Sequence, residues 1–194
     1  MKKLFVIIGL ISTIVLIMCS CGGKTTPVED FTYERVSGEI VITGYTGTEF
    51  DIAIPAEIDD RPVTVIGEKA FSGYDLKTIV LPDTIERIEE EAFYECDLLE
   101  DVELPNGLSF IGYAAFDNCT SLDAITLPDD VMFDRRMSMA LDGGHYIIWS
   151  PFDTNTVVYV SRDSETLYSL EENKEILDAH FSIMESFYIN YVVE

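Results

Sequence analysis

Apolar residues recur along the middle of the chain at a fixed spacing of 23 positions. Three stretches align without gaps, beginning at Leu76, Leu99 and Leu122. In each stretch a short run alternates apolar and polar residues and then meets a proline, which predicts one short strand that the proline ends. The other residues that repeat at this spacing are Leu81, Leu104 and Leu127, then Pro82, Pro105 and Pro128, then Phe93 and Phe116, and then Cys96 and Cys119.

The repeat predicts a solenoid with one strand per repeat. Ile79 and Leu81 would point inward, while Thr78 and Val80 would point outward. One coil cannot bury its apolar residues alone, so successive coils must stack and share a core. The strands of neighbouring coils would then pair in parallel, about 4.8 Å apart. A looser earlier copy runs over residues 51–71, where Asp59-Asp60-Arg61-Pro62 inserts a turn.

The segments on either side of the repeat are predicted to close its ends. Residues 31–36 and 39–44, joined at Ser37-Gly38, favour a β-hairpin cap, and Thr156–Val160 favours a last strand. From Asp163 the spacing becomes helical, so residues 161–194 are expected to form a helical cap with a terminal strand over residues 188–193. The region 134–155 lacks the repeat signature and is expected to be a degenerate coil. The apolar positions of the expected helix are Leu167, Leu170, Leu177, Phe181 and Met184.

The pattern L-x-x-I-x-L-P-x-x-I-x-x-I-x-x-x-A-F-x-x-C resembles the BspA-like leucine-rich repeats of bacterial surface proteins. The resemblance covers residues 40–133, about half of the mature chain. It implies a right-handed leucine-rich-repeat solenoid, a β-rich α/β fold over residues 31–160, with surface exposure and a binding role. Members of the family have been associated with adhesion and protein–protein contacts. The repeat has no catalytic residues, so the resemblance implies none here.

The N-terminal residues have the order of a secretory signal peptide. Lys2 and Lys3 precede an apolar run over residues 4–18, which is shorter than the roughly twenty residues of a membrane-spanning helix. Met18-Cys19-Ser20-Cys21 resembles a bacterial lipobox, which predicts removal of residues 1–20 and lipidation of Cys21. The alternatives are an uncleaved anchor, or ordinary cleavage that leaves Cys21 as a thiol. Residues 21–30 would form a flexible tether of roughly 30 Å.

The net charge excludes one class of partner. The chain carries 12 basic and 36 acidic residues, a formal charge of −24, and loss of Lys2 and Lys3 with the signal peptide leaves −26. A field of this sign repels phosphate backbones and anionic lipids. We therefore expect no nucleic acid and membrane contact only through the lipid anchor. Because the acids are spread along the chain, they favour either a solvated surface or a docking face for basic partners or divalent cations.

Few residues suggest chemistry. Stacking would bring Cys96 and Cys119 within disulfide range, whereas the family resemblance implies a ladder of buried free thiols; both alternatives stay open. Zinc would need two more soft ligands, so no metal and no cofactor are expected. His145, with Asp142 and Ser150 nearby, is the one arrangement that suggests a hydrolase, but no nucleophile-elbow motif accompanies it. We therefore predict that the protein is not an enzyme.

The outward positions of the predicted strands form the candidate binding face. Such a rigid array suits recognition because little ordering entropy is lost on contact. We expect a cell-surface lipoprotein that binds a protein or a surface glycan; the alternatives are a structural envelope protein without a dedicated ligand, and a hydrolase with a site near 134–155. The residues of the candidate face are Asp51, Thr78, Val80, Asp101, Glu103 and Thr126.

Overall fold

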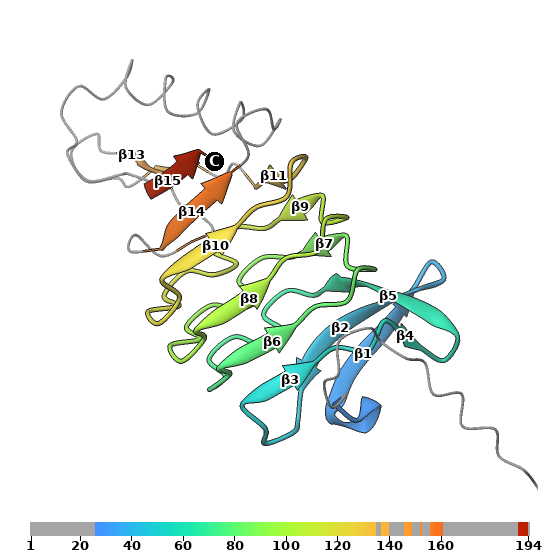
Figure 1. Ribbon diagram of the computed structural model, residues 1–194. Helices are drawn as coiled ribbons and strands as arrows, with labels where there is room; N and C mark the ends of the chain where they lie inside the picture. Colours follow the sequence, from blue (N-terminus) through green and yellow to red (C-terminus); the bar gives the residue numbers. More distant parts are fainter. Residues whose placement is uncertain are drawn as a thin grey trace, which may run out of the picture.

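The computed structural model describes residues 26–134, 137–139, 146–148, 152, 156–160 and 190–193. The chain winds into a β-solenoid whose coils lie on top of one another (Figure 1). One side of the solenoid is a parallel sheet in which each repeat contributes three residues. Its strands are β3 (Asp51–Ala53), β6 (Thr78–Val80) and β8 (Asp101–Glu103).

A second parallel sheet runs along another side, so the prediction of one strand per repeat was incomplete. Most of its strands have only two residues, which is too short for alternation to be visible in the sequence. The antiparallel strand β4 (Glu57–Ile58) pairs with the first of them across a turn at Asp59 and Asp60, both with positive φ. The strands of this sheet are β5 (Arg61–Ile66), β7 (Arg87–Ile88), β9 (Phe110–Ile111) and β11 (Met132–Phe133).

The Ala-Phe segments form a third side of stacked turns, held by backbone hydrogen bonds between coils. The N–H of Phe71 donates to the carbonyl of Ala92 and that of Phe93 to Ala115, both at 2.8 Å. Each turn begins with a residue of positive φ, namely Lys69, Glu91 or Ala114. The backbone groups of this side are therefore satisfied by the neighbouring coil, and no coil is complete by itself.

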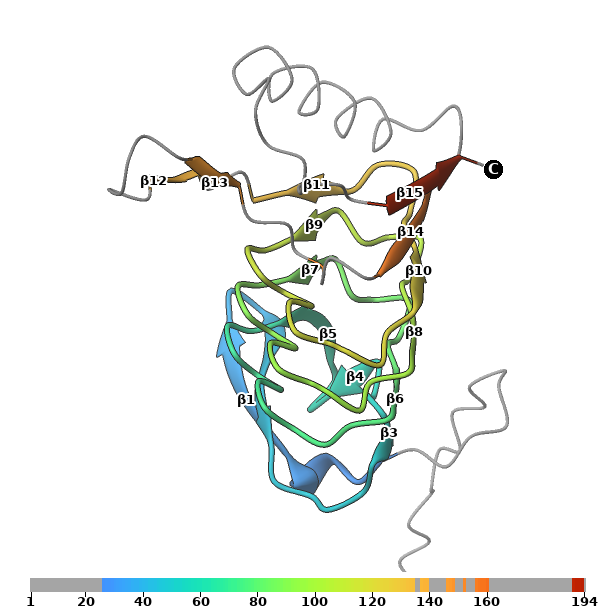
Figure 2. The same ribbon diagram turned by 90° about the vertical axis from the view of Figure 1, so that its left-hand side faces the viewer.

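The core consists of columns in which equivalent side chains meet. Leu81, Leu104 and Leu127 are all buried, with exposed fractions of 7%, 8% and 4%. Their strands lie side by side in Figure 2, and the register Val80↔Glu103 places the first two next to each other. The predicted column is confirmed, and so is the inward orientation of Ile79.

A second column is a stack of phenylalanine rings. Phe71 and Phe93 lie 5.3 Å apart with an interplanar angle of 2°, and Phe93 and Phe116 lie 5.0 Å apart at 10°. Phe152 continues the stack at 5.8 Å from Phe116, although 36 residues separate them instead of 23. The repeat therefore continues in space beyond the point where its sequence signature ends.

The N-terminal hairpin joins the solenoid edge-on. Strand β1 (Phe31–Val36) pairs with β2 (Glu39–Tyr45) in the antiparallel sense, which confirms the predicted hairpin at Ser37-Gly38. Strand β2 then pairs in parallel with β5 and extends the second sheet. At the end of the phenylalanine stack, Tyr74 lies between Phe71 and Tyr45.

The folded body starts earlier than the expected tether over 21–30 allows. Thr26 is buried, and its Oγ1 accepts a hydrogen bond from the N–H of Ala53 at 2.9 Å. Residues Val28–Asp30 form the 3-10 helix η1, and the carbonyl of Asp30 accepts a bond from the N–H of Thr46. This segment is fixed against the first coil because Thr26 bonds to β3 and Asp30 bonds to Thr46, which follows β2.

At the C-terminal end of the solenoid, three more parallel strands follow the β3–β6–β8 sheet and form a sheet of their own (Figure 1). They are β10 (Ala124–Thr126), β14 (Val157–Val160) and β15 (Asn190–Val193), so both predicted C-terminal strands are confirmed. The region 134–155 includes an antiparallel pair, β12 (Met137–Met139) with β13 (Tyr146–Ile148).

Several predictions lie outside the described residues. They are the signal peptide over 1–20, the lipidation of Cys21, the helical part of the cap over 161–189, and the arrangement around His145. Within the part of the chain that the structure describes, no helix is long and apolar enough to cross a membrane.

Candidate binding face

The outward positions of β3, β6 and β8 form two columns on one sheet. Strand register places Asp51 beside Thr78 and Thr78 beside Asp101. The second column holds Val80 and Glu103 next to each other. The inward neighbours on the same strands, such as Ile79 at 2% exposed, are core residues. Alternation therefore assigns these side chains to solvent, as the sequence predicted.

Contacts within this face are few and local. The Thr78 hydroxyl donates to Asp51 Oδ1 at 2.8 Å. Val80 is 53% exposed and Phe50, which precedes β3, is 51% exposed. Thr126, on β10, is also exposed, but its strand pairs with β14 instead of continuing the hydrogen-bonded ladder from β8. The structure thus unites five of the six predicted residues in one ladder and places the sixth on the strand beyond it.

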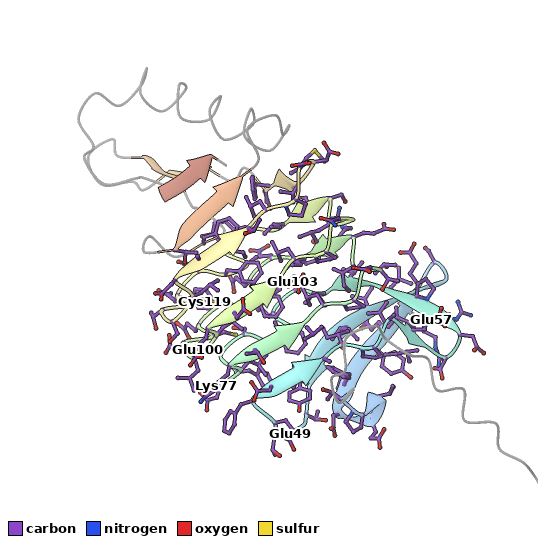
Figure 3. All side chains as sticks on the ribbon, in the orientation of Figure 1. Glu49, Glu57, Lys77, Glu100, Glu103 and Cys119 are labelled. Atoms are coloured by element: carbon purple, nitrogen blue, oxygen red, sulfur yellow. The ribbon has the colours of Figure 1, made fainter. Side chains whose placement is uncertain are left out.

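The face and its edge are dominated by acids. Figure 3 shows Lys77 and Glu100 in line along the edge where the chain enters β6 and β8, with Glu103 over β8. Lys77 and Glu100 occupy equivalent positions, because the Glu100 N–H donates to the Lys77 carbonyl at 2.9 Å. Asp51, Asp101 and Glu103 are all exposed. A surface of this charge attracts basic partners.

Most other cations of the described region are held by carboxylates away from this face. Lys69 lies 3.3 Å from Glu91, and this hydrogen-bonded pair raises the pKa of the Lys69 ammonium. Arg35 pairs with Asp59, and hydrogen bonds from Arg35 and then Tyr33 lower the pKa of the Asp59 carboxyl. These pairs fix surface turns and leave the acidic field of the face in place.

Cys96 and Cys119 are stacked free thiols in the core. The Sγ of Cys96 donates to the Phe71 carbonyl at 3.0 Å, and that of Cys119 to the Phe93 carbonyl at 3.1 Å. Contact with Cys96 and then burial raise the pKa of the Cys119 thiol far above its ordinary value. The pair thus behaves as buried packing groups and not as nucleophiles.

In the described part of the chain, which contains neither histidine of the sequence, the cysteines and carboxylates form no group of three that would hold a metal ion. Every buried side-chain nitrogen or oxygen there has a hydrogen-bond partner. The geometry is that of a packed scaffold with an outward surface.

Comparison with known proteins agrees with this scaffold. Six copies of the BspA type leucine-rich repeat region match residues 57–135. A leucine-rich repeat protein of Bacteroides capillosus is 30% identical, with a TM-score of 0.57 over 70% of this chain and 97% of that one. The chain belongs to the BspA-type leucine-rich repeat family. Proteins of this family are typically bacterial surface proteins.

Two further solved structures share the architecture. The T. pallidum leucine-rich repeat protein is 25% identical, with a TM-score of 0.55 over 70% of this chain and 71% of that protein. A leucine-rich cell surface protein of Faecalibacterium prausnitzii is 21% identical, with a TM-score of 0.51 over 73% and 46%, and supports the fold alone. None of the curated proteins matches this BspA-type chain.

Sequence reasoning overlooked the outward side of the second sheet. Its outward residues are Val41, Val65, Arg87, Phe110 and Met132, which strand register places in one column. They differ in type and do not keep the spacing of 23 throughout, so no sequence repeat marks them. The signal that would have found them is a buried isoleucine directly after three of them, at Ile66, Ile88 and Ile111. Because side chains alternate along a strand, the residue before each isoleucine must face outward.

Proposed function

We propose that this BspA-type protein is a membrane-anchored binding module whose first sheet contacts a protein or glycan partner. The observation that carries the proposal is the two-column array on β3, β6 and β8. Asp51, Asp101 and Glu103 stand there in fixed register around the exposed side chain of Val80. The backbone beneath is held by interstrand bonds, so a partner would order little of the protein on binding.

The charge of the array selects the partner. Carboxylates in a negatively charged molecule favour a partner with a basic patch and speed its association. Val80 supplies an apolar contact between them, which a purely solvated surface would not need. We therefore propose a basic protein surface as the preferred ligand, with a neutral glycan as the weaker alternative.

The anchor proposal rests on Cys21 and on the short distance from it to the folded body. Thr26 is fixed at β3, so only residues 21–26 remain as a link, and they span at most about 20 Å. Lipidation of Cys21 would therefore hold the β3 end of the solenoid close to the membrane. A Cys21→Ala variant should move from the detergent phase to the aqueous phase on phase separation. Unchanged partitioning would contradict the anchor.

The binding proposal is tested by charge reversal on the face. An Asp101→Lys/Glu103→Lys variant should lose a cross-linked partner that a photoreactive residue at Val80 captures on intact cells. The matched control is Glu57→Lys on β4, which lies at the opposite side in Figure 3. If both variants capture the cross-linked partner equally well, the β3–β6–β8 face does not bind it. No saturable capture at all would favour a structural envelope protein.

A further inference from the structure

The second sheet carries a continuous outward stripe of a different chemistry. Strand register links Val41 to Val65, Val65 to Arg87, Arg87 to Phe110, and Phe110 to Met132. Four of these five residues are apolar. Met132 is 64% exposed, the highest fraction among the large exposed apolar residues of the described region. Val41, Val65 and Phe110 are half-buried. We call these five residues the stripe.

The charge of Arg87 does not interrupt the stripe. Its Nε donates to Glu89 Oε1 at 2.8 Å, so the guanidinium is neutralised locally. Its Cζ lies 4.3 Å from the ring centroid of Phe110, within the range of a cation–π contact. Arg87 thus presents a flat, paired group beside Phe110 and bridges the apolar residues on either side.

Carboxylates flank the stripe. Glu86 precedes Arg87 and is exposed, whereas the carboxylate of Glu89 is already paired with Arg87. At the first coil the exposed Glu34 pairs with Val41. An apolar surface with an acidic rim is complementary to a segment with an apolar face and basic flanks.

The spacing of the stripe determines which backbone such a segment would have. Neighbouring strands lie about 4.8 Å apart, so the stripe crosses five strands over about 19 Å, perpendicular to the strand direction. The apolar face of an α-helix presents a side chain every 5.4 Å or so, and about 13 helical residues span 19 Å. An extended peptide along the same line would alternate its side chains away from the stripe.

We propose that the stripe is a second docking surface, which binds a cationic amphipathic helix of a partner protein along the solenoid axis. The helix would lay its apolar side chains over Val65, Phe110 and Met132, and its basic residues would meet Glu86 and Glu34. This surface lies on a different sheet from the proposed binding face. It neither requires nor implies a ligand on the β3–β6–β8 sheet.

The probe is a synthetic amidated helix of about 14 residues, with leucine at every third or fourth position and lysine and alanine elsewhere. A scrambled peptide of identical composition lacks the apolar face. Binding is measured to the full chain in phosphatidylcholine nanodiscs, as wild type and as Val65→Thr/Met132→Gln. The matched control, Val28→Thr/Leu98→Gln, removes exposed apolar groups outside both proposed surfaces, since Val28 and Leu98 are 37% and 40% exposed.

We expect saturable binding of the helical peptide that the stripe variant weakens at least tenfold and the control variant leaves unchanged. The scrambled peptide should bind at least tenfold more weakly than the helix. Equal binding of both peptides, or equal loss in both variants, would show that only net charge attracts the probe and would overturn the proposal. Absence of binding by the wild type would overturn it as well.

The two surfaces are separated by one further variant. Asp101→Lys/Glu103→Lys, which tests the β3–β6–β8 face, should change peptide affinity far less than the stripe variant. Loss of peptide binding in that variant alone would assign the helix to the first sheet and overturn the stripe. Failure of the proposed partner at Val80 would leave the stripe result unaffected, so the two proposals fail separately.

Discussion

Phe93 is the most informative residue for testing how coils depend on each other. It is fully buried and stacked between Phe71 and Phe116, at 5.3 and 5.0 Å. Truncation of a buried phenylalanine to alanine costs about 3–5 kcal/mol, as lost transfer free energy plus a cavity term. The rings on both sides are held by the same turns, so the cavity cannot collapse easily. Phe93→Ala should therefore lower the free energy of unfolding by about 5 kcal/mol, near the upper end of this range.

A loss of this size is a large fraction of the 5–15 kcal/mol that stabilises a typical domain. Urea unfolding followed by circular dichroism measures it, with Phe50→Ala as control. Phe50 is 51% exposed, so its truncation should cost less than about 1 kcal/mol. Because the Phe93 turn bonds to the turns before and after it, hydrogen exchange should accelerate at the amides of both Phe71 and Phe93.

Two results would refute this reasoning. A cost below about 1.5 kcal/mol would mean that the ring is not enclosed on both sides. A normal cost with faster exchange confined to the Phe93 coil would mean that coils are stable individually, against the nearest-neighbour behaviour expected of a solenoid.

Three further predictions concern single residues. Glu95 is exposed with φ of 58°, so Glu95→Gly should relieve backbone strain and raise the free energy of unfolding by about 1 kcal/mol. Glu100 does not have a positive φ, so Glu100→Gly should lower the free energy of unfolding by about 0.5–1 kcal/mol. Urea midpoints that shift in the same direction in both variants would contradict the strain at Glu95. Cys96 and Cys119 should resist a chromogenic thiol reagent at pH 8 in the folded protein and react in urea, because both are buried and because contact with Cys96 and then burial raise the pKa of Cys119. Labelling of the folded protein within minutes would contradict their burial. The carboxyl of Asp59 should titrate below its ordinary pKa of 3.8, and Arg35→Gln should raise that pKa, which an NMR titration measures. The stability that the ionised Asp59 contributes is present above pH 3.8 and is lost as the pH falls through the lowered pKa of the folded protein. A pKa that does not change in the variant would exclude the ion pair.

The sequence predicted the solenoid because equivalent core residues must be alike when they stack on each other. Leu81 and Leu104 keep both residue type and spacing for this reason. Outward residues face solvent and have no such constraint. The stripe residues Val65, Arg87 and Phe110 differ in kind, and only strand register shows that they are neighbours.

Phe152 shows a second limit of the sequence pattern. The excursion that includes β12 and β13 lengthens its coil, so the ring returns to the phenylalanine stack out of the expected spacing. A fixed period cannot register such an insertion, because the position in space is kept while the count of residues changes. The candidate face was predictable because alternation around the buried Ile52, Ile79, Val102 and Ile125 assigns each of its residues to the outward side.

Stacking of successive coils is tested most directly by methyl–methyl nuclear Overhauser effects in the full chain. With leucine methyl groups labelled, cross-peaks should join Leu81 to Leu104 and Leu104 to Leu127. None should join Leu81 to Leu127, which lie two strand spacings apart, roughly 10 Å. Absence of both neighbouring cross-peaks, with the three leucines buried in separate environments, would contradict the stacked solenoid.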